Sequence, residues 1–410
     1  MSSRRILGNA GFLYLLTFSN YFLGLLLFPF LSRVLSVETF GLVGFAMAYV
    51  LVFQIIVEFG FMISATARVS NARDELSTVG QIVSATTAAR LLLVLLSTLM
   101  FLLSAWIMPI VRENLTVLSL FFAGAVVLAL IPDFYFRGVE RMRTIAIRTV
   151  ATRVLSIVLV LLFVRDDSQV FLVPVFLLVG NALALAVSFA VILRDGVRIL
   201  PVRIRTIWTT ISQGALFFVS RLAVAVNQSI AALFLGFQYS PTSAQLGQFA
   251  GATRVASAGE LMLTPITDSL YPHMIRRRDY KLFARIYLVG VVIWFVICVG
   301  VFVAAEQICV LLLGPDYAFA GQLLQILMPG VFLAFSSNMF GYNALSPIGL
   351  AAHANWAILL SAVVNVAAYS VLAGLDQLSL TTACVVMSCT NIVVFSYRVT
   401  VFTRYRHRTR

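Results

Sequence analysis

The sequence predicts an all-α integral membrane protein with about twelve transmembrane helices arranged in two six-helix bundles. Composition is the first reason: 61% of the 410 residues are hydrophobic, 11% are charged, and the mean hydropathy is +1.00. No water-soluble core could bury so large an apolar fraction, so the surrounding solvent must be lipid. The second reason is that the apolar residues form continuous stretches of about 20, enough to cross a hydrocarbon core of roughly 30 Å.

Twelve such stretches follow one another along the chain. They cover residues 12–31, 41–63, 91–110, 115–136, 147–164, 170–193, 207–235, 246–271, 286–305, 323–342, 356–375 and 378–397. Each predicts a helix, because the stretches lack the alternation of barrel strands and a helix satisfies its own backbone in lipid. The first is too long for a secretory signal, and no small-residue cleavage site follows it. A basic connection near residues 194–206 divides the set, which predicts one bundle over residues 1–200 and another over 201–410.

Positive charges predict the orientation of these helices. When alternate connections are assigned to opposite sides, almost all the arginines and Lys281 share the side of the N-terminus, and only Arg33, Arg112 and Arg165 fall opposite. By the positive-inside rule, both termini are expected in the cytoplasm. The same asymmetry explains the net charge of +13, and no nucleic-acid partner is expected, because the basic residues lie in short turns between spans.

The sequence has no recognisable pattern of catalytic or metal-binding residues. The four cysteines lie in or beside apolar stretches without metal-ligand spacing, and the three histidines are scattered. No phosphate-binding glycine loop is present. Short connections leave no room for a soluble catalytic domain. We therefore expect a transporter rather than an enzyme, with no cofactor other than a coupling proton or sodium ion.

Arg221 is the clearest polar residue inside a predicted span, with apolar runs on both sides. A charge at the centre of a bilayer is costly and indicates a function or a partner. Helical spacing places Arg221, Ala225 and either Gln228 or Ser229 on one face, which should line a cavity rather than face lipid. This arrangement predicts anion binding; the alternative is a structural ion pair, for instance with Glu260.

The eighth predicted span carries a second set of polar residues. Arg254 either lines the same cavity or reaches the interface. Glu260, Thr264, Thr267 and Tyr271 would share one face of a continuous helix, and Glu260 would either bind a coupling ion or neutralise an arginine.

The first half carries its own polar residues. Gln54 and Glu58 lie one turn apart, and Asp133 and Arg153 lie near span ends, where structural roles are expected. Arg90, at the mouth of the third span, is expected to snorkel towards water. A faint repeat places Phe40-Gly41 and Leu246-Gly247 after spans that contain Asn20 and Asn227.

Several motifs resemble one family of membrane proteins. Residues 132–142 read Pro-Asp-Phe-Tyr-Phe-Arg-Gly-Val-Glu-Arg-Met, which resembles the aromatic, glycine and Glu-x-Met signature after the fourth span of Wzx-type O-antigen flippases, with Arg137 where glutamine is frequent. Further similar stretches extend over nearly the whole chain: Leu31 to Leu35, Glu38-x-Phe40-Gly41, Glu58-Phe59-Gly60-Phe61, Leu246-Gly247 to Ala250, Arg254, Pro265, Leu270-Tyr271-Pro272, Leu312-Leu313-Gly314, Asp316-Tyr317 and Ala320.

The resemblance implies the MOP flippase fold, with two six-helix bundles around a central cavity, in the bacterial inner membrane. It implies a substrate of undecaprenyl-diphosphate-linked oligosaccharide for surface polysaccharide synthesis, with a polymerase and a chain-length regulator as candidate partners. Arg221, Arg254, Gln228 and Asn227 would then bind the substrate, and Glu260 and Glu58 would couple an ion or form a cavity ion pair. A cation-coupled drug exporter of the same superfamily and a membrane enzyme of polysaccharide assembly are the alternatives.

Overall fold

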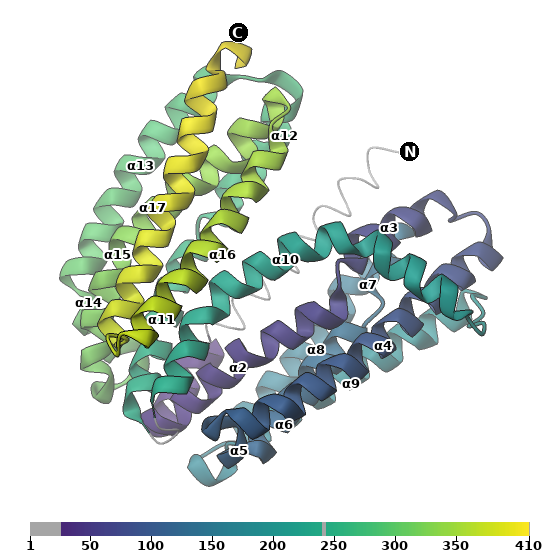
Figure 1. Cartoon of the computed structure of the whole chain (residues 1–410), viewed down its shortest axis with the longest axis horizontal. Helices are drawn as coiled ribbons and strands as arrows, with labels where there is room; N and C mark the ends of the chain where they lie inside the picture. The colour runs from purple at the N-terminus through teal and green to yellow at the C-terminus, as the bar shows by residue number, and fades with distance from the viewer. Residues whose placement is uncertain (1–25, 240–242, 410) are drawn as a thin grey trace. The chain divides into compact units, whose positions relative to one another are not determined.

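The computed structural model describes residues 26–239 and 243–409, and every regular element in these ranges is a helix (Figure 1). The first group of helices comprises α2 (Val37–Glu58), α3 (Phe61–Asn71), α4 (Leu76–Ile107), α5 (Pro109–Glu113), α6 (Leu115–Leu130), α7 (Asp133–Gly138), α8 (Met142–Phe163), α9 (Leu172–Arg194) and α10 (Ile204–Gln238). The chain continues with α11 (Ala244–Leu261), α12 (Thr264–Arg277), α13 (Tyr280–Val303), α14 (Ala305–Leu313), α15 (Ala318–Asn338), α16 (Ala351–Gly374) and α17 (Leu380–Tyr405).

Ten segments of the described residues are long and apolar enough to cross a membrane. They correspond to ten of the twelve predicted spans. Of the other two, the first, over 12–31, lies mainly outside the described residues, and the eighth, over 246–271, is not among the ten. Helix α4 begins at Leu76 rather than at residue 91. Its first turns are rich in glycine, alanine, serine and threonine, and they are buried against neighbouring helices, so they contribute helix without contributing hydropathy. Arg90 therefore lies well inside α4.

Three predicted spans are interrupted. The second breaks after Glu58, where Phe59 and Gly60 have φ angles of +40° and +74°, and the fourth breaks before Pro132, between α6 and α7. The eighth breaks between α11 and α12, where Pro265 lacks the N–H that a continuous helix would bond to Leu261. The prediction of one polar face running from Glu260 to Tyr271 on a continuous helix is therefore wrong.

Two further boundaries differ from prediction in the second half. Helix α12 continues through Pro272 to Arg277 instead of ending at residue 271. Helix α15 is followed by a π-helical turn, Met339–Asn343, in which Gly341 has a ψ angle of −117°. Side chains beside such breaks can reach backbone carbonyls that an intact helix would occupy.

The described residues form two compact units. The first comprises residues up to Ser36 together with Ala46–Ala225, and the second comprises Val37–Phe45 together with Val226–Arg410. The unit boundaries thus fall inside α2 and α10. The division at residue 200 into two six-helix bundles stays a prediction.

Within the first unit, α9 packs against α6 and α8, and α3 packs against α4 and α7. The core where α3, α4, α7 and α8 meet contains the buried residues Phe61, Val83, Phe134, Phe136 and Ile145. Both interrupted spans of this unit, α2–α3 and α6–α7, contribute to the same packed region.

Within the second unit, α15 is the central helix and packs against α11, α13, α14 and α17, with α16 beside α17 (Figure 1). Gly41 and Gly247, the glycines of the faint repeat, lie backbone to backbone in this unit, because a Cβ on Gly41 would lie 2.5 Å from the Gly247 nitrogen.

Replacing Gly60 by alanine is expected to destabilise the protein by about 1–3 kcal/mol, because an L-residue is strained at φ +74° and the new Cβ would lie 2.7 Å from Cβ of Phe217. Thermal unfolding of the purified protein in detergent measures the effect. Gly300→Ala is the control, because no atom lies within 4 Å of its added Cβ, and it should leave the melting temperature unchanged or slightly raised. Equal behaviour of the two variants would contradict this account.

Candidate functional site

Arg221 forms an ion pair with Glu58 inside the first unit. Nη2 of Arg221 donates to Oε2 of Glu58, and the other carboxylate oxygen, Oε1, accepts from Nε2 of Gln54 at 2.9 Å. The Glu58 side chain is 12% exposed and that of Arg221 is 32% exposed. The carboxylate is therefore held from two sides, whereas about a third of the Arg221 side chain remains accessible.

The break between α2 and α3 brings the two charges together. Gly60 and Gly214 approach so closely that a Cβ on Gly60 would lie 2.9 Å from the Gly214 carbonyl oxygen. Beside them, the rings of Phe59 and Phe218 stack with centroids 4.3 Å apart. The backbone after Glu58 is thus pressed onto α10 about one turn before Arg221.

A second ion pair joins Asp133 to Arg148. Nη2 of Arg148 lies 2.6 Å from Oδ1 of Asp133, and Nη1 donates to Oγ of Ser188 at 2.6 Å. The Arg148 side chain is only 3% exposed. Helices α7, α8 and α9 are therefore linked by one buried guanidinium.

Arg90 is buried between these two pairs and does not snorkel. It is 1% exposed, its Nη1 donates to the Ile131 carbonyl at 3.0 Å, and its guanidinium lies over the Phe134 ring at 5.1 Å. The carbonyl that it binds belongs to the break between α6 and α7, where it also accepts from the Asp133 N–H at 2.9 Å. Arg90 also interacts electrostatically with Glu58, Asp133 and Arg221. The snorkelling prediction is wrong because α4 begins more than three turns earlier than expected.

The five charged residues Glu58, Arg90, Asp133, Arg148 and Arg221 form what we call the arginine cluster. All lie within segments able to span a membrane, and three arginines face two carboxylates. One positive charge is thus left over inside these segments. Such an excess is suited to an anionic ligand, which would supply the missing negative charge.

The other residues predicted for substrate binding lie in the second unit. Asn227 on α10 donates to Oγ of Ser361 at 2.9 Å and accepts from Nδ2 of Asn365 at 2.7 Å, and Thr390 donates to Asn365. This network links α10, α16 and α17 with uncharged groups. Gln228, the next residue, is exposed.

Arg254 and Glu260 both lie on α11 and are half-buried. Glu260 occupies the last turn, directly before the break that leads to α12. Glu260 lies six positions after Arg254, so the two side chains point in different directions around the helix. The structure thus brings Arg221 to Glu58, and it places Arg254, Glu260, Asn227 and Gln228 in a separate unit.

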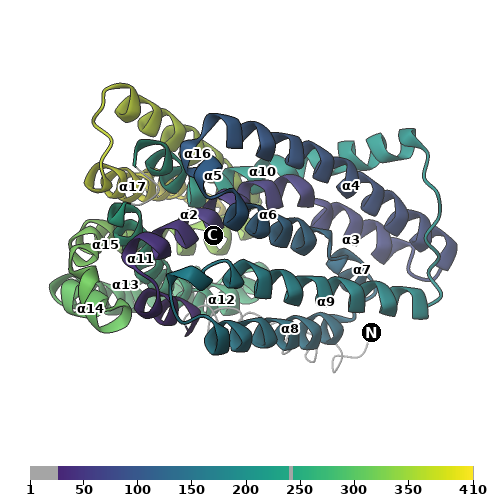
Figure 2. The same cartoon turned by 90° about the horizontal axis from the view of Figure 1, so that it is seen from below.

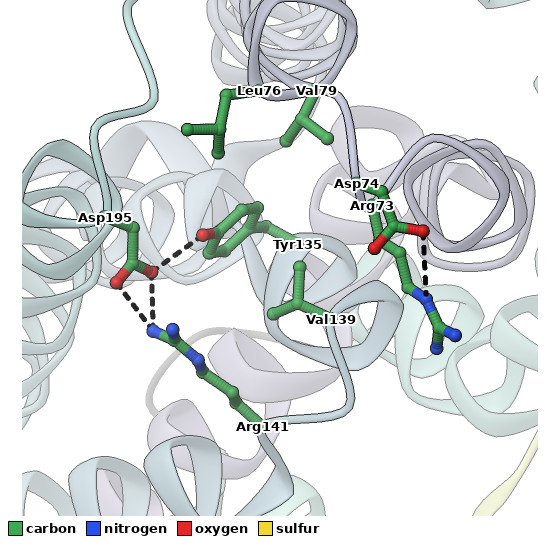
Figure 3. Close-up of a pocket in the computed structure, with 8 residues that line it drawn as sticks. All are labelled: Arg73, Asp74, Leu76, Val79, Tyr135, Val139, Arg141 and Asp195. Atoms are coloured by element: carbon green, nitrogen blue, oxygen red, sulfur yellow. Dashed lines mark hydrogen bonds and ion pairs between the residues drawn. The ribbon is translucent and has the colours of Figure 1, made fainter. Parts of the chain in front are cut away.

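The Glu-x-Met signature takes part in a set of polar contacts near the arginine cluster. We call Tyr135, Arg141 and Asp195, together with the pair Arg73–Glu140, the latch. Oδ2 of Asp195 accepts from the Tyr135 hydroxyl at 2.7 Å and from Nη1 of Arg141 at 2.6 Å, as Figure 3 shows. Glu140, with φ +61°, pairs with Arg73 at 3.4 Å. The hydrogen bond to Asp195 raises the pKa of Arg141, so the guanidinium stays charged. Arg73, Tyr135, Arg141 and Asp195 line a cavity of about 250 Å³ that opens to solvent.

The latch explains why the signature has this sequence. Gly138 is required where α7 meets α3, because a Cβ there would lie 2.5 Å from Cγ1 of Val69. Tyr135 and Arg141 then reach the end of α9 from both sides of the turn. The motif therefore fixes the C-terminal end of α7. Asp133 of the arginine cluster is the first residue of this short helix.

A profile of the family described as polysaccharide biosynthesis proteins (Polysacc_synt) matches residues 6–278, more than half of the chain. The chain belongs to this family. Two curated relatives are each described as "Putative O-antigen transporter": one from Escherichia coli (strain K12), 27% identical over 348 residues that cover 82% of both chains, and one from Shigella dysenteriae, 23% identical over 77% of this chain and 80% of the relative.

Solved structures show which fold this polysaccharide biosynthesis protein adopts. The lipid II flippase MurJ in an inward closed conformation superposes with a TM-score of 0.69 at 15% identity, covering 96% of this chain and 87% of MurJ. An inward-facing multidrug resistance MATE family transporter of the MOP superfamily superposes with a TM-score of 0.65 at 15% identity, over 95% and 94% of the two chains. The predicted family, the all-helical membrane fold and the assignment to a transporter family are confirmed.

Two members of the arginine cluster were missed by sequence reasoning. Arg148 was counted among the charges that set orientation, and Arg90 was placed at a helix mouth. The stretch of small residues before Arg90, which is typical of packed helix surfaces, could have placed Arg90 inside a helix. Asp133, fifteen residues before Arg148, could have indicated its ion-pair partner.

The Glu58–Arg221 pair is expected to show energetic coupling. Glu58→Gln and Arg221→Met should each destabilise the protein by about 1–3 kcal/mol, because each leaves one partner without its counter-charge, and the double variant should cost less than the sum. Unfolding free energies in mixed micelles, arranged as a double-mutant cycle, measure the coupling.

The exposed Arg73–Glu140 pair is the matched control, with side chains 46% and 34% exposed. Substituting it in the same way should give coupling below about 0.5 kcal/mol. Additive effects at Glu58 and Arg221 would contradict the pairing.

Proposed function

We propose that this protein moves undecaprenyl-diphosphate-linked oligosaccharide repeat units from the cytoplasmic to the periplasmic leaflet of a bacterial inner membrane, for O-antigen or related surface polysaccharide. The observation that carries the proposal is the arginine cluster with its surplus positive charge inside the spans of the first unit. Membership of a polysaccharide biosynthesis family and relatives described as O-antigen transporters support this substrate class.

Arg221 is the residue best placed to meet the diphosphate. A guanidinium has five N–H donors, and Glu58 takes only one of its terminal nitrogens. Nε of Arg221 is buried and has no hydrogen-bond partner among the described residues. With about a third of the side chain open, phosphate oxygens can take up the remaining donors, and a planar guanidinium binds phosphate with two parallel hydrogen bonds.

Binding of the diphosphate to Arg221 also suggests a role for Glu58 in ion coupling. A diphosphate that draws Arg221 away leaves the Glu58 carboxylate with Gln54 and the electrostatic influence of Arg90. An unpaired carboxylate in such a place favours uptake of a proton or a sodium ion. We therefore propose Glu58 as a point where an ion gradient acts, with half-buried Glu260 in the second unit as the other candidate.

The remaining predicted ligands are assigned to the sugar and to later stages of transport. Arg254 would take over the diphosphate, and Gln228 and Asn227 would hydrogen-bond the oligosaccharide. Transport proceeds by alternating access, and no covalent chemistry is needed. A polysaccharide polymerase and a chain-length regulator would use the product.

Deletion of the gene in its host tests the function. Lipid-linked repeat units should accumulate on the cytoplasmic face while surface polysaccharide disappears, and the wild-type gene should restore both. Unchanged surface polysaccharide with new sensitivity to hydrophobic cations would favour the drug exporter, which the fold shared with MATE transporters makes the second candidate.

Arg221→Ala, expressed in the deletion strain, is expected to lower surface polysaccharide at least tenfold at normal membrane abundance, because the diphosphate loses its main cation. Arg221→Lys should recover part of the activity, since a lysine keeps the charge but not the forked geometry. Arg112→Ala, which removes an exposed arginine from α5, is the control and should behave as wild type. Full surface polysaccharide in Arg221→Ala would remove this residue from the mechanism.

A further inference from the structure

The connection between α9 and α10 has features that the transport proposal does not use. Together with the adjoining helix ends it contains Arg194, Arg198, Arg203 and Arg205. The same segment exposes Ile199, Leu200, Ile204 and Trp208, which are 52%, 38%, 63% and 60% accessible. Figure 2 shows its middle part as an extended trace between the ends of the two helices. We call residues 194–208 the basic strap.

The basic strap is held in place by its backbone. The Leu200 N–H donates to Oγ of Ser84 on α4 at 2.8 Å, and the Arg198 carbonyl lies so close to α4 that a Cβ on Gly80 would come within 2.7 Å of it. Val197 is 1% exposed and belongs to the core of the first unit. With the main chain docked inward, the arginine and large apolar side chains remain on the outside.

The positive charge of the basic strap is not neutralised by the protein. Its one acidic residue, Asp195, is taken up by Arg141 and Tyr135 in the latch. Within the part of the chain that the structure describes, none of the four strap arginines forms an ion pair. The strap therefore presents a surplus of positive charge beside exposed apolar side chains.

The length of α10 allows this surface to lie at the edge of the hydrocarbon. A helix of 35 residues, Ile204–Gln238, is roughly 50 Å long, whereas about 30 Å crosses the core of a bilayer. The surplus length allows Ile204 and Trp208, in its first two turns, to lie at the interface, where tryptophan is favoured. Orientation alone requires positive charge, but it requires neither a docked backbone nor interleaved Ile, Leu and Trp side chains.

We propose that the basic strap is a binding surface for anionic phospholipids. The arginines pair with the phosphate groups of the leaflet, and Ile199, Leu200, Ile204 and Trp208 insert among the upper parts of the acyl chains. Charge complementarity selects this partner: a leaflet with negative headgroups supplies the anions that the protein lacks here, and its acyl chains cover the apolar side chains. The strap thereby anchors the start of α10, the helix that carries Arg221.

Quenching of Trp208 by brominated lipids tests the proposal with the full-length protein in vesicles. The Trp208 signal is the difference between the protein and its Trp208→Phe variant, each in phosphatidylcholine containing a minor fraction of brominated phosphatidylglycerol or brominated phosphatidylcholine. Brominated phosphatidylglycerol should quench Trp208 about twofold more strongly or better, and high salt should reduce this preference. Equal quenching by the two lipids would overturn the proposal.

Two charge variants make the test specific to the basic strap. The combination Arg198→Gln, Arg203→Gln and Arg205→Gln should abolish the preference for phosphatidylglycerol. The matched control, Arg276→Gln, Arg277→Gln and Lys281→Gln, removes three exposed basic residues around the end of α12 and should retain it. A preference that survives in the strap variant, or that falls equally in both variants, would overturn the proposal as well.

Discussion

The ion pair between Glu58 and Arg221 is the interaction on which the proposed site depends. Two charges inside membrane-spanning segments are tolerated only because they meet, and they meet only because the chain breaks directly after Glu58. The break needs Gly60 in a left-handed conformation, and Gly214 must lack a side chain for α10 to approach. Local backbone chemistry, helix packing and electrostatics thus converge on one pair, with Arg221 left partly open.

The break between α6 and α7 likewise brings charged side chains together inside the first unit. Pro132 ends α6, Arg90 binds a carbonyl at this break, and Asp133 in the next turn holds Arg148. Both breaks of the first unit therefore carry a carboxylate, and arginines from neighbouring helices bind at each. Irregular backbone at membrane depth is expected only where protein or a polar cavity surrounds it, and it marks binding sites in transporters. The arginine cluster fits this description.

Much of the fold could be predicted from hydropathy, because lipid forces each apolar stretch into a helix. The start of α4 could not, since its small residues owe their helix to packing rather than to lipid. Arg221 was conspicuous because a charge within an apolar run is costly in a bilayer and therefore indicates a function or a partner. Its partner was not, because Glu58 lies 163 residues away in sequence and only tertiary structure selects it over Glu260. Arg90 and Arg148 were missed because each lies at the start of a predicted span, where an arginine is expected to reach water.

The central claim is that the arginine cluster recognises the diphosphate of a lipid-linked sugar, and reconstituted vesicles test it most directly. Wild-type protein and Arg221→Ala would be compared for movement of a polyprenyl-diphosphate-linked oligosaccharide into a leaflet protected from an added glycosidase. The account predicts rapid protection with wild type and protection no faster than in protein-free vesicles with Arg221→Ala. Equal rates for the two proteins, or no protection by wild type above protein-free vesicles, would contradict it.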